Sequence, residues 1–117
     1  MTKTKLARLM WVTSAGVDPQ YVQGKNFLYK RIIKPLFLAN IYADLRHSEE
    51  ILEKSSLTWV VVRPSRLTNG PLTKIYRVQA DGSPKDASEI SRADVAHFML
   101  KETVDHQYDF KKPIIAY

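Results

Sequence analysis

The sequence has 117 residues, with 18 lysines and arginines against 12 aspartates and glutamates, and a net charge of +6. This length predicts a single domain over residues 1–117, and the composition, 44% apolar and 26% charged, is typical of a folded globular protein. The absence of cysteine excludes a disulfide scaffold and a cysteine-based zinc site, and no apolar run approaches the ~20 residues of a membrane span, so we expect a cytoplasmic protein that does not enter a membrane.

The positive charge is concentrated near the amino terminus. Residues 1–40 carry seven basic side chains and one acidic one, whereas residues 41–117 carry eleven of each sign. A basic arm for nucleic acid is one interpretation. Because the basic residues are scattered singly, with no aromatic platform or helix-turn-helix pattern, we expect no nucleic-acid partner. A solvated basic face, or one that meets an anionic cofactor, is favoured.

The first predicted element is a buried parallel strand over residues 8–13, an apolar run that ends at residues 14–16. Residues 17–23 are predicted as loop. Residues 26–40 are predicted as two short helical pieces, because Pro35 interrupts an otherwise apolar pattern.

The clearest predicted helix covers residues 39–54, and charged side chains occupy most of one face. Its expected apolar face consists of Ile41, Leu45, Ile51 and Leu52. Residues 57–62 follow at once, and this β-branched and aromatic run predicts a central strand of a covered sheet. We expect the strand to end at Arg63 and Pro64, because proline lacks the N–H that a strand ladder needs.

After a predicted loop over residues 65–73, residues 74–79 alternate like a half-exposed strand. Ser91 is the predicted N-cap of the last helix, with Asp94 as an acidic partner in its first turn. The apolar face expected for this helix consists of Val95, Phe98, Met99 and Leu100. With a final strand over residues 113–116, the order of elements predicts an α/β fold with parallel neighbouring strands.

Four ordered motifs resemble one known family. They are residues 11–16 (WVTSAG), 48–59 (SEEILEKSSLTW), 62–71 (VRPSRLTNGP) and 90–96 (ISRADVA). Together they resemble the carboxyl-terminal half of the atypical short-chain dehydrogenases/reductases, most closely the NAD(P)H-binding, NmrA-like group with its flavin reductase and biliverdin reductase B-like branch. The resemblance implies a Rossmann-like fold, a doubly wound and mostly parallel sheet, with NADP or NAD as cofactor.

One part of the family pattern is missing from this sequence. The family holds the cofactor pyrophosphate in a Gly-rich turn after its first strand, but the four glycines here form no such motif. The resemblance therefore implies a partial Rossmann-like domain, a fragment that lacks the N-terminal strands and the Gly-rich phosphate loop.

The resemblance places Thr13 and Ser14 beside the nicotinamide, at the end of a strand. The Ser14 hydroxyl is the expected catalytic group, donating to a substrate carbonyl or a flavin edge while the cofactor supplies the hydride. The alternative is that Ser14 only caps the strand exit, since serine serves turns readily. The Tyr-x-x-x-Lys pair usual in dehydrogenases is absent, because Tyr42 is followed four residues later by Arg46. Tyr42 is interpreted as a packing or helix-surface residue.

Arg63, Pro64 and Ser65 match the loop that lines the nicotinamide and substrate pocket in the family, so we expect them to bind cofactor. Arg66 is expected to hold a substrate carboxylate through two parallel hydrogen bonds. For Arg63 an ion pair with an acid such as Asp94 is the favoured interpretation, with Asp94 itself serving as a helix N-terminal charge.

The function implied by the resemblance is transfer of hydride from NAD(P)H to a flavin, biliverdin, quinone or similar planar acceptor. A non-enzymatic nucleotide-sensing regulator and an inactive truncated product are the alternatives. No metal site is expected, because His47, His97 and His106 share no ligand spacing. If the strand over residues 8–13 lacks a neighbour, its apolar edge is expected to pair with another chain, so that the polypeptide forms a homodimer or aggregates.

Overall fold

The computed structural model describes residues 8–17 and 39–117 of the chain. Most of the predicted loop over residues 17–23, and nearly all of the two helical pieces predicted over residues 26–40, lie outside the described residues. The described strands are β1 (Arg8–Val12), β2 (Thr58–Pro64), β3 (Arg66–Thr68), β4 (Arg77–Gln79), β5 (Glu89–Ser91) and β6 (Ile114–Ala116). The described helices are a 3-10 turn, η2 (Ala15–Val17), and the α-helices α2 (Ala39–Glu53) and α3 (Arg92–Asp105).

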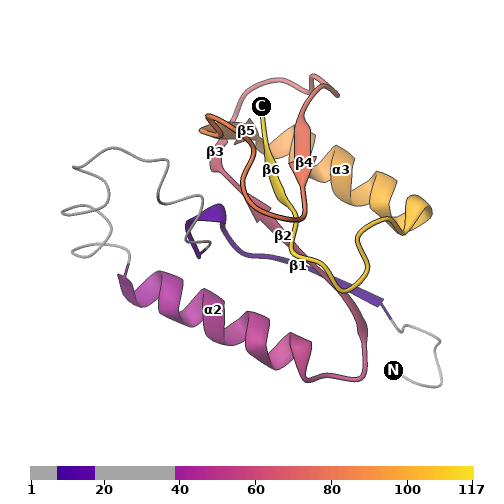
Figure 1. Ribbon diagram of the computed structural model, residues 1–117. Helices are drawn as coiled ribbons and strands as arrows, with labels where there is room; N and C mark the ends of the chain where they lie inside the picture. The colour runs from indigo at the N-terminus through magenta and orange to yellow at the C-terminus, as the bar shows by residue number, and fades with distance from the viewer. Residues whose placement is uncertain (1–7, 18–38) are drawn as a thin grey trace.

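Within these residues, four strands form one sheet in the order β1-β2-β6-β4, and β3 and β5 form a small second sheet (Figure 1). The β1–β2 and β2–β6 pairs are parallel, which confirms the predicted α/β arrangement. The prediction of parallel neighbours is wrong for β4, which runs antiparallel to β6.

The two α-helices cover opposite faces of β2, as Figure 1 shows. Side chains alternate across a strand, and Val60 and Val62 accordingly pack with Phe98 of α3. Trp59 and Val61 point the other way and pack with Leu52 and Leu9. The sequence prediction of a central strand covered on both faces is therefore confirmed.

Helix α2 buries a different stripe from the one predicted. Ile41 and Ile51 are more than half exposed, so their assignment to the apolar face is wrong. The buried positions are Tyr42, Glu49 and Leu52, and Glu49 is buried because its charge is paired inside the fold. The prediction of Tyr42 as a packing residue agrees with its contact to Gly16, where an added Cβ would overlap the tyrosine ring.

Helix α3 begins as predicted. The Ser91 hydroxyl accepts a hydrogen bond of 3.1 Å from the backbone N–H of Asp94, which satisfies one of the helix's first free N–H groups. Val95 and Phe98 face the core, but Leu100 is 71% exposed and its predicted place on the apolar face is wrong.

The segment between β2 and β5 departs most from prediction. Residues 66–68, predicted as loop, form β3 and pair in parallel with β5. The strand predicted over residues 74–79 is limited to β4, because Lys74 has a left-handed backbone (φ 62°) and its N–H donates to Asp94 instead of a neighbouring strand.

Strand β1 lies at the edge of the sheet as far as the described residues show, paired with β2 alone. Trp11 is 42% exposed and Val12 39% exposed. The sequence prediction of a parallel strand is confirmed, whereas the expectation that this strand is buried is wrong, because its first three residues are only half-buried and its last two are exposed.

Candidate functional site

The predicted cofactor residues converge at the carboxyl edge of the sheet, where β1 and β2 end side by side. Val12 is opposite Val62, and the backbone N–H of Thr13 donates to the Val62 carbonyl at 2.9 Å. This register brings Ser14 to the level of Pro64 on the neighbouring strand. In open α/β sheets, ligands bind outside the carboxyl ends of the strands.

Ser14 makes the turn that leaves β1. Its Oγ accepts a hydrogen bond of 3.1 Å from the N–H of Gly16, and its carbonyl accepts one from Val17 at the end of η2. This geometry shows that Ser14 caps the strand exit. A serine hydroxyl also carries one donor, and no acceptor for that donor occurs among the described residues, so capping and donation to a ligand are compatible.

Thr13 and Arg63 are joined through one buried carboxylate. The Thr13 hydroxyl donates to Glu49 Oε2 at 2.7 Å, and Arg63 donates to both Glu49 oxygens, at 2.7 Å from Nη2 and 3.2 Å from Nε. The interpretation of Arg63 as half of an ion pair is thus correct, but the partner is Glu49 on α2. The suggested partner, Asp94, belongs to a separate cluster at the start of α3.

Glu49 is 1% exposed and carries its charge inside the fold. Burial alone raises the pKa of this carboxyl, but hydrogen bonds from Arg63 and Thr13, with the positive charges of Arg63 and Lys112, outweigh burial and hold the pKa below its ordinary value. The Lys112 amine lies 3.4 Å from Glu49 and also pairs with Glu53, so β2, α2 and the segment before β6 meet at one ionised group.

The other residues of the predicted loop differ in exposure. Pro64 and Ser65 are buried against β6, where both the N–H and the hydroxyl of Ser65 donate to the Ile115 carbonyl, at 3.1 Å and 3.3 Å. Arg66 points outward on β3 with 70% of its side chain exposed, and donates to Glu89 at 2.8 Å. Ser65 therefore presents little polar surface, whereas the Arg66 guanidinium is open to solvent.

A second polar cluster, which the sequence analysis did not anticipate, is centred on the buried carboxylate of Asp94. This carboxylate accepts hydrogen bonds from the N–H groups of Thr73 and Lys74, both at 2.9 Å, and from the hydroxyls of Thr73, Ser91 and Tyr117. Its role as a charge in the first turn of α3 is confirmed. The cluster ties the loop before β4 and the last residue of the sequence to the start of α3.

Glu49, which contacts Thr13 and Arg63, is the member of the candidate site that the sequence analysis did not anticipate. A usable signal was present, since Tyr42, Glu49 and Leu52 fall on one face at the spacing of a buried helical stripe. The acidic side chain concealed it, because charged residues are normally assigned to the solvent face.

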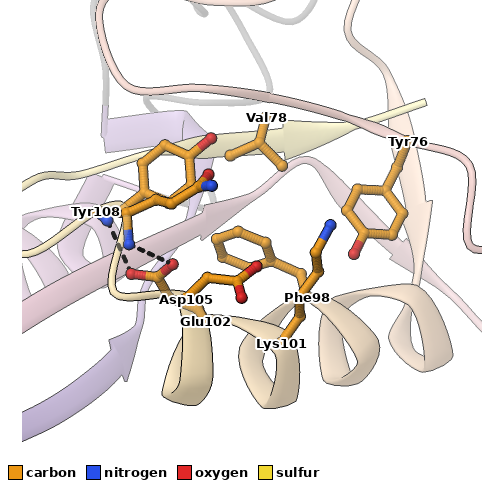
Figure 2. A pocket seen from close by; sticks show the side chains of 8 residues that line it. Tyr76, Val78, Phe98, Lys101, Glu102, Asp105 and Tyr108 are labelled. Atoms are coloured by element: carbon orange, nitrogen blue, oxygen red, sulfur yellow. Dashed lines mark hydrogen bonds between the residues drawn. The ribbon is translucent and has the colours of Figure 1, made fainter.

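Two cavities lie away from the carboxyl edge. One, of about 360 Å³, is an apolar groove between β1 and α2 that is lined by Leu9, Trp11 and Ile51 among others. The other, of about 260 Å³, lies between α3 and β4 and is lined by the rings of Tyr76 and Tyr108 among others (Figure 2). Neither cavity is lined by the predicted cofactor residues.

In the described part of the chain, no group of three or more histidine or carboxylate side chains is placed to hold a metal ion. None of the helices described there combines the length and the apolar character needed to cross a bilayer.

Comparison with known proteins shows the family of the chain and the proteins that share its fold. The model of the family described as NAD(P)H-binding matches residues 1–106. Among solved structures, the chain is similar to a wide-type short-chain dehydrogenase/reductase from Veillonella parvula in complex with NADP, with a TM-score of 0.78, 14% identity, and coverage of 99% of this chain and 53% of that chain.

Two further solved structures share the fold of this chain. The protein chuY from E. coli CFT073 has a TM-score of 0.75 and 20% identity, over 98% of this chain and 58% of that chain. The oxidoreductase ylbE from Lactococcus lactis has a TM-score of 0.71 and 14% identity, over 98% of this chain and 48% of that chain. The chain spans about half the length of the solved structures it matches.

These similarities confirm the predicted fold class, and the family match agrees with the expected cofactor class, NADP or NAD. The chain belongs to the NAD(P)H-binding family and has a partial Rossmann-like α/β fold.

Proposed function

We propose that the chain forms the nicotinamide-facing part of an NAD(P)H-dependent oxidoreductase. The observation that carries the proposal is the position of Ser14 at the carboxyl end of β1, level with Pro64 at the end of β2. Membership of the NAD(P)H-binding family supports the cofactor. The position at the carboxyl edge supports the site, because ligands of open α/β sheets bind there.

The residues present fit the nicotinamide end of the cofactor. When bound, NAD(P)H supplies the hydride. The Ser14 hydroxyl can still donate a hydrogen bond to an oxygen or nitrogen of the molecule that accepts the hydride. Glu49 holds Thr13 and Arg63 in place, so these two act as positioning residues for Ser14 and for the backbone around Pro64. The exposed Arg66 guanidinium donates to Glu89 through Nη2, and its other N–H groups are the ones that would meet a substrate carboxylate.

The sequence offers no corresponding motif for the pyrophosphate end of the cofactor, because its four glycines form no Gly-rich phosphate motif. The proposal therefore assigns only the nicotinamide end of the site to this chain.

The proposal also covers the molecule that accepts the hydride. The Arg-Pro-Ser-Arg loop over residues 63–66 and the motif over residues 90–96 resemble the NmrA-like group and its biliverdin reductase B-like branch. This resemblance supports a planar acceptor, which is a flavin, biliverdin or quinone.

The first experiment is an NADPH titration of the purified chain that follows the fluorescence of Trp11 and Trp59, with NADPH oxidation then measured in the presence of a flavin. We expect saturable binding and a Ser14→Ala variant that loses at least about tenfold in turnover while its NADPH affinity changes by less than about twofold. Ser56→Ala, an exposed serine after α2, is the matched control. A folded sample without binding, or equal turnover in both variants, contradicts the proposal.

One observation favours the alternative of a non-enzymatic nucleotide-binding regulator. The side-chain donors of Thr13, Arg63 and Ser65 are engaged within the fold, so a ligand at these strand ends meets few side-chain donors that could take part in a reaction. Saturable NADPH binding without oxidation of the cofactor supports this alternative.

We also propose that the chain forms a homodimer through β1. The Thr13 N–H points to β2, so the strand's alternation directs the N–H and C=O groups of Met10 and Val12 to the opposite side. No partner for these groups occurs among the described residues. An edge of this kind, with exposed Trp11 and Val12 beside it, is a template for a second strand.

A further inference from the structure

The cavity between α3 and β4 is separate from the carboxyl edge of the sheet. It has a volume of about 260 Å³ and shares no lining residue with the predicted cofactor site. A cavity of about 150 Å³ holds a benzene molecule, so this one has room for a single aromatic ring with a short substituent.

The cavity is formed by the way α3 ends. His106 caps the helix in the left-handed conformation (φ 52°), and its N–H donates to the Glu102 carbonyl at 3.1 Å. This turn reverses the chain and carries Tyr108 back over α3. The Glu102 side chain holds this returning segment in place, because its carboxylate accepts hydrogen bonds from the N–H groups of Gln107 and Tyr108, at 3.0 Å and 2.8 Å.

Three aromatic rings surround the space. Phe98 lies between Tyr76 and Tyr108, with ring centroids 6.4 Å and 5.6 Å away and edge-to-face geometry in both pairs. Figure 2 shows the three rings side by side above α3. Since aromatic rings pair favourably when offset or edge-on, a fourth ring supplied by a ligand finds partners on several sides.

The charged side chains that line the cavity differ in whether they have an ion-pair partner within the described residues. Glu102 is fully occupied, because besides the two N–H groups it binds Arg8 at 2.7 Å. Lys101 and Asp105, in contrast, have no ion-pair partner within the described part of the chain. In Figure 2 the Lys101 side chain extends from α3 toward the cavity, with its amine drawn between the rings of Phe98 and Tyr76.

Lys101 and Asp105 stand one turn apart on α3, a rise of about 6 Å along the axis. A molecule that lies across this turn with a carboxylate toward Lys101 and an ammonium toward Asp105 complements both charges. We propose that this cavity binds a free aromatic α-amino acid, with its ring among Tyr76, Phe98 and Tyr108 and its charged groups on Lys101 and Asp105. The site is independent of the oxidoreductase proposal.

The test uses the whole chain labelled with ¹⁵N and titrated with L-phenylalanine, phenethylamine (no carboxylate), 3-phenylpropionate (no ammonium) and L-leucine (no ring). We expect saturable shifts for phenylalanine at the amides around Tyr76, Phe98 and Tyr108, and weaker binding of the other three. No saturable shift with phenylalanine, or equal affinity for all four compounds, overturns the proposal.

Charge variants then identify the contacts. Lys101→Gln is expected to lower the affinity for phenylalanine about three- to fivefold and to leave the affinity for phenethylamine unchanged. Asp105→Asn is expected to lower the affinity for phenylalanine by a similar factor and to leave the affinity for 3-phenylpropionate unchanged. Lys54→Gln and Asp44→Asn, which remove exposed charges on or just after α2, are the matched controls. Unchanged phenylalanine affinity in both cavity variants, with their spectra showing a folded chain, contradicts the assignment.

Discussion

The hydroxyl of Thr13 donates a 2.7 Å hydrogen bond to the buried carboxylate of Glu49, which connects the carboxyl end of β1 to the inner face of α2. The same carboxylate binds Arg63 of β2. One ionised group therefore sets the position of both strand ends at which the cofactor site is proposed. A buried charge of this kind is costly when it loses a partner, because the remaining charge cannot return to water.

The first prediction concerns this group. Glu49→Ala leaves the Arg63 guanidinium partly buried without its carboxylate, and we expect it to lower the free energy of unfolding by about 3–5 kcal/mol in urea titrations. Glu50→Ala, which removes the exposed neighbouring carboxylate, is the control and is expected to change stability by less than about 0.5 kcal/mol. Equal effects of the two substitutions refute the assigned role.

The second prediction concerns acid stability. Burial alone raises the pKa of Asp94, but hydrogen bonds from Tyr117, Lys74 and Thr73 outweigh it and hold the pKa well below its ordinary value. A carboxyl whose pKa is lower in the folded than in the unfolded state stabilises the fold above its unfolded pKa of about 3.9. That contribution is lost as the pH falls below this value.

We therefore expect the urea midpoint of the wild type to fall steeply between about pH 4 and pH 2. Asp94→Asn is expected to have a lower midpoint at pH 6 and a shallower dependence on pH. Asp44→Asn, on the exposed face of α2, serves for comparison and keeps the wild-type profile. An unaltered pH dependence in the Asp94 variant contradicts the prediction.

The third prediction tests the contact between η2 and α2. A Cβ added at Gly16 overlaps the ring of Tyr42, which is buried and has little room to move. We expect Gly16→Ala to destabilise the fold by about 1–3 kcal/mol. At Gly70 the nearest atom to an added Cβ is Thr68 Oγ1, at 3.3 Å, so Gly70→Ala is expected to be milder. A thermal melt that ranks the two in the opposite order refutes this account.

The fourth prediction concerns self-association. Light scattering of the wild-type chain is expected to give twice the monomer mass, while Val12→Lys, which places a charge on the β1 edge, shifts the sample to monomer. Val104→Lys, at a 79% exposed position on α3, is expected to remain dimeric. A wild-type chain that is monomeric at all concentrations tested contradicts dimerisation through β1.

Much of the fold could be predicted from local patterns. The runs that became β1, β2 and β6 are mostly apolar, and those of β2 and β6 are rich in β-branched residues. The cap of α3 is visible in the spacing of Ser91 and Asp94. These features depend on neighbours in the sequence. The strands β3 and β5, with three residues each, could not be predicted in the same way, because strands this short are defined by pairing with each other rather than by their own composition.

For the candidate site, the sequence predicted where the residues lie better than which residues they contact. Ser14 and Pro64 lie at adjacent strand ends as the motifs implied, but the partner of Arg63 was misassigned. An ion pair between an α-helix and a strand depends on how the helix packs against the sheet. Glu49 is also charged, so its place on the buried stripe of α2 does not show in the pattern of apolar residues. Asp94 satisfied a local rule, yet its contacts with Thr73 and Tyr117 arise only from tertiary structure.

The parallel pairing of β1 with β2 also bears on how the chain reaches its structure. Arg8 is opposite Thr58, and β2 in turn pairs with β6 near the end of the sequence, so the sheet closes only when widely separated segments meet. Closing such long loops costs chain entropy before any strand contact forms, which slows folding. We expect the chain to refold more slowly than a helical bundle of equal length, because its sheet depends on contacts between distant segments.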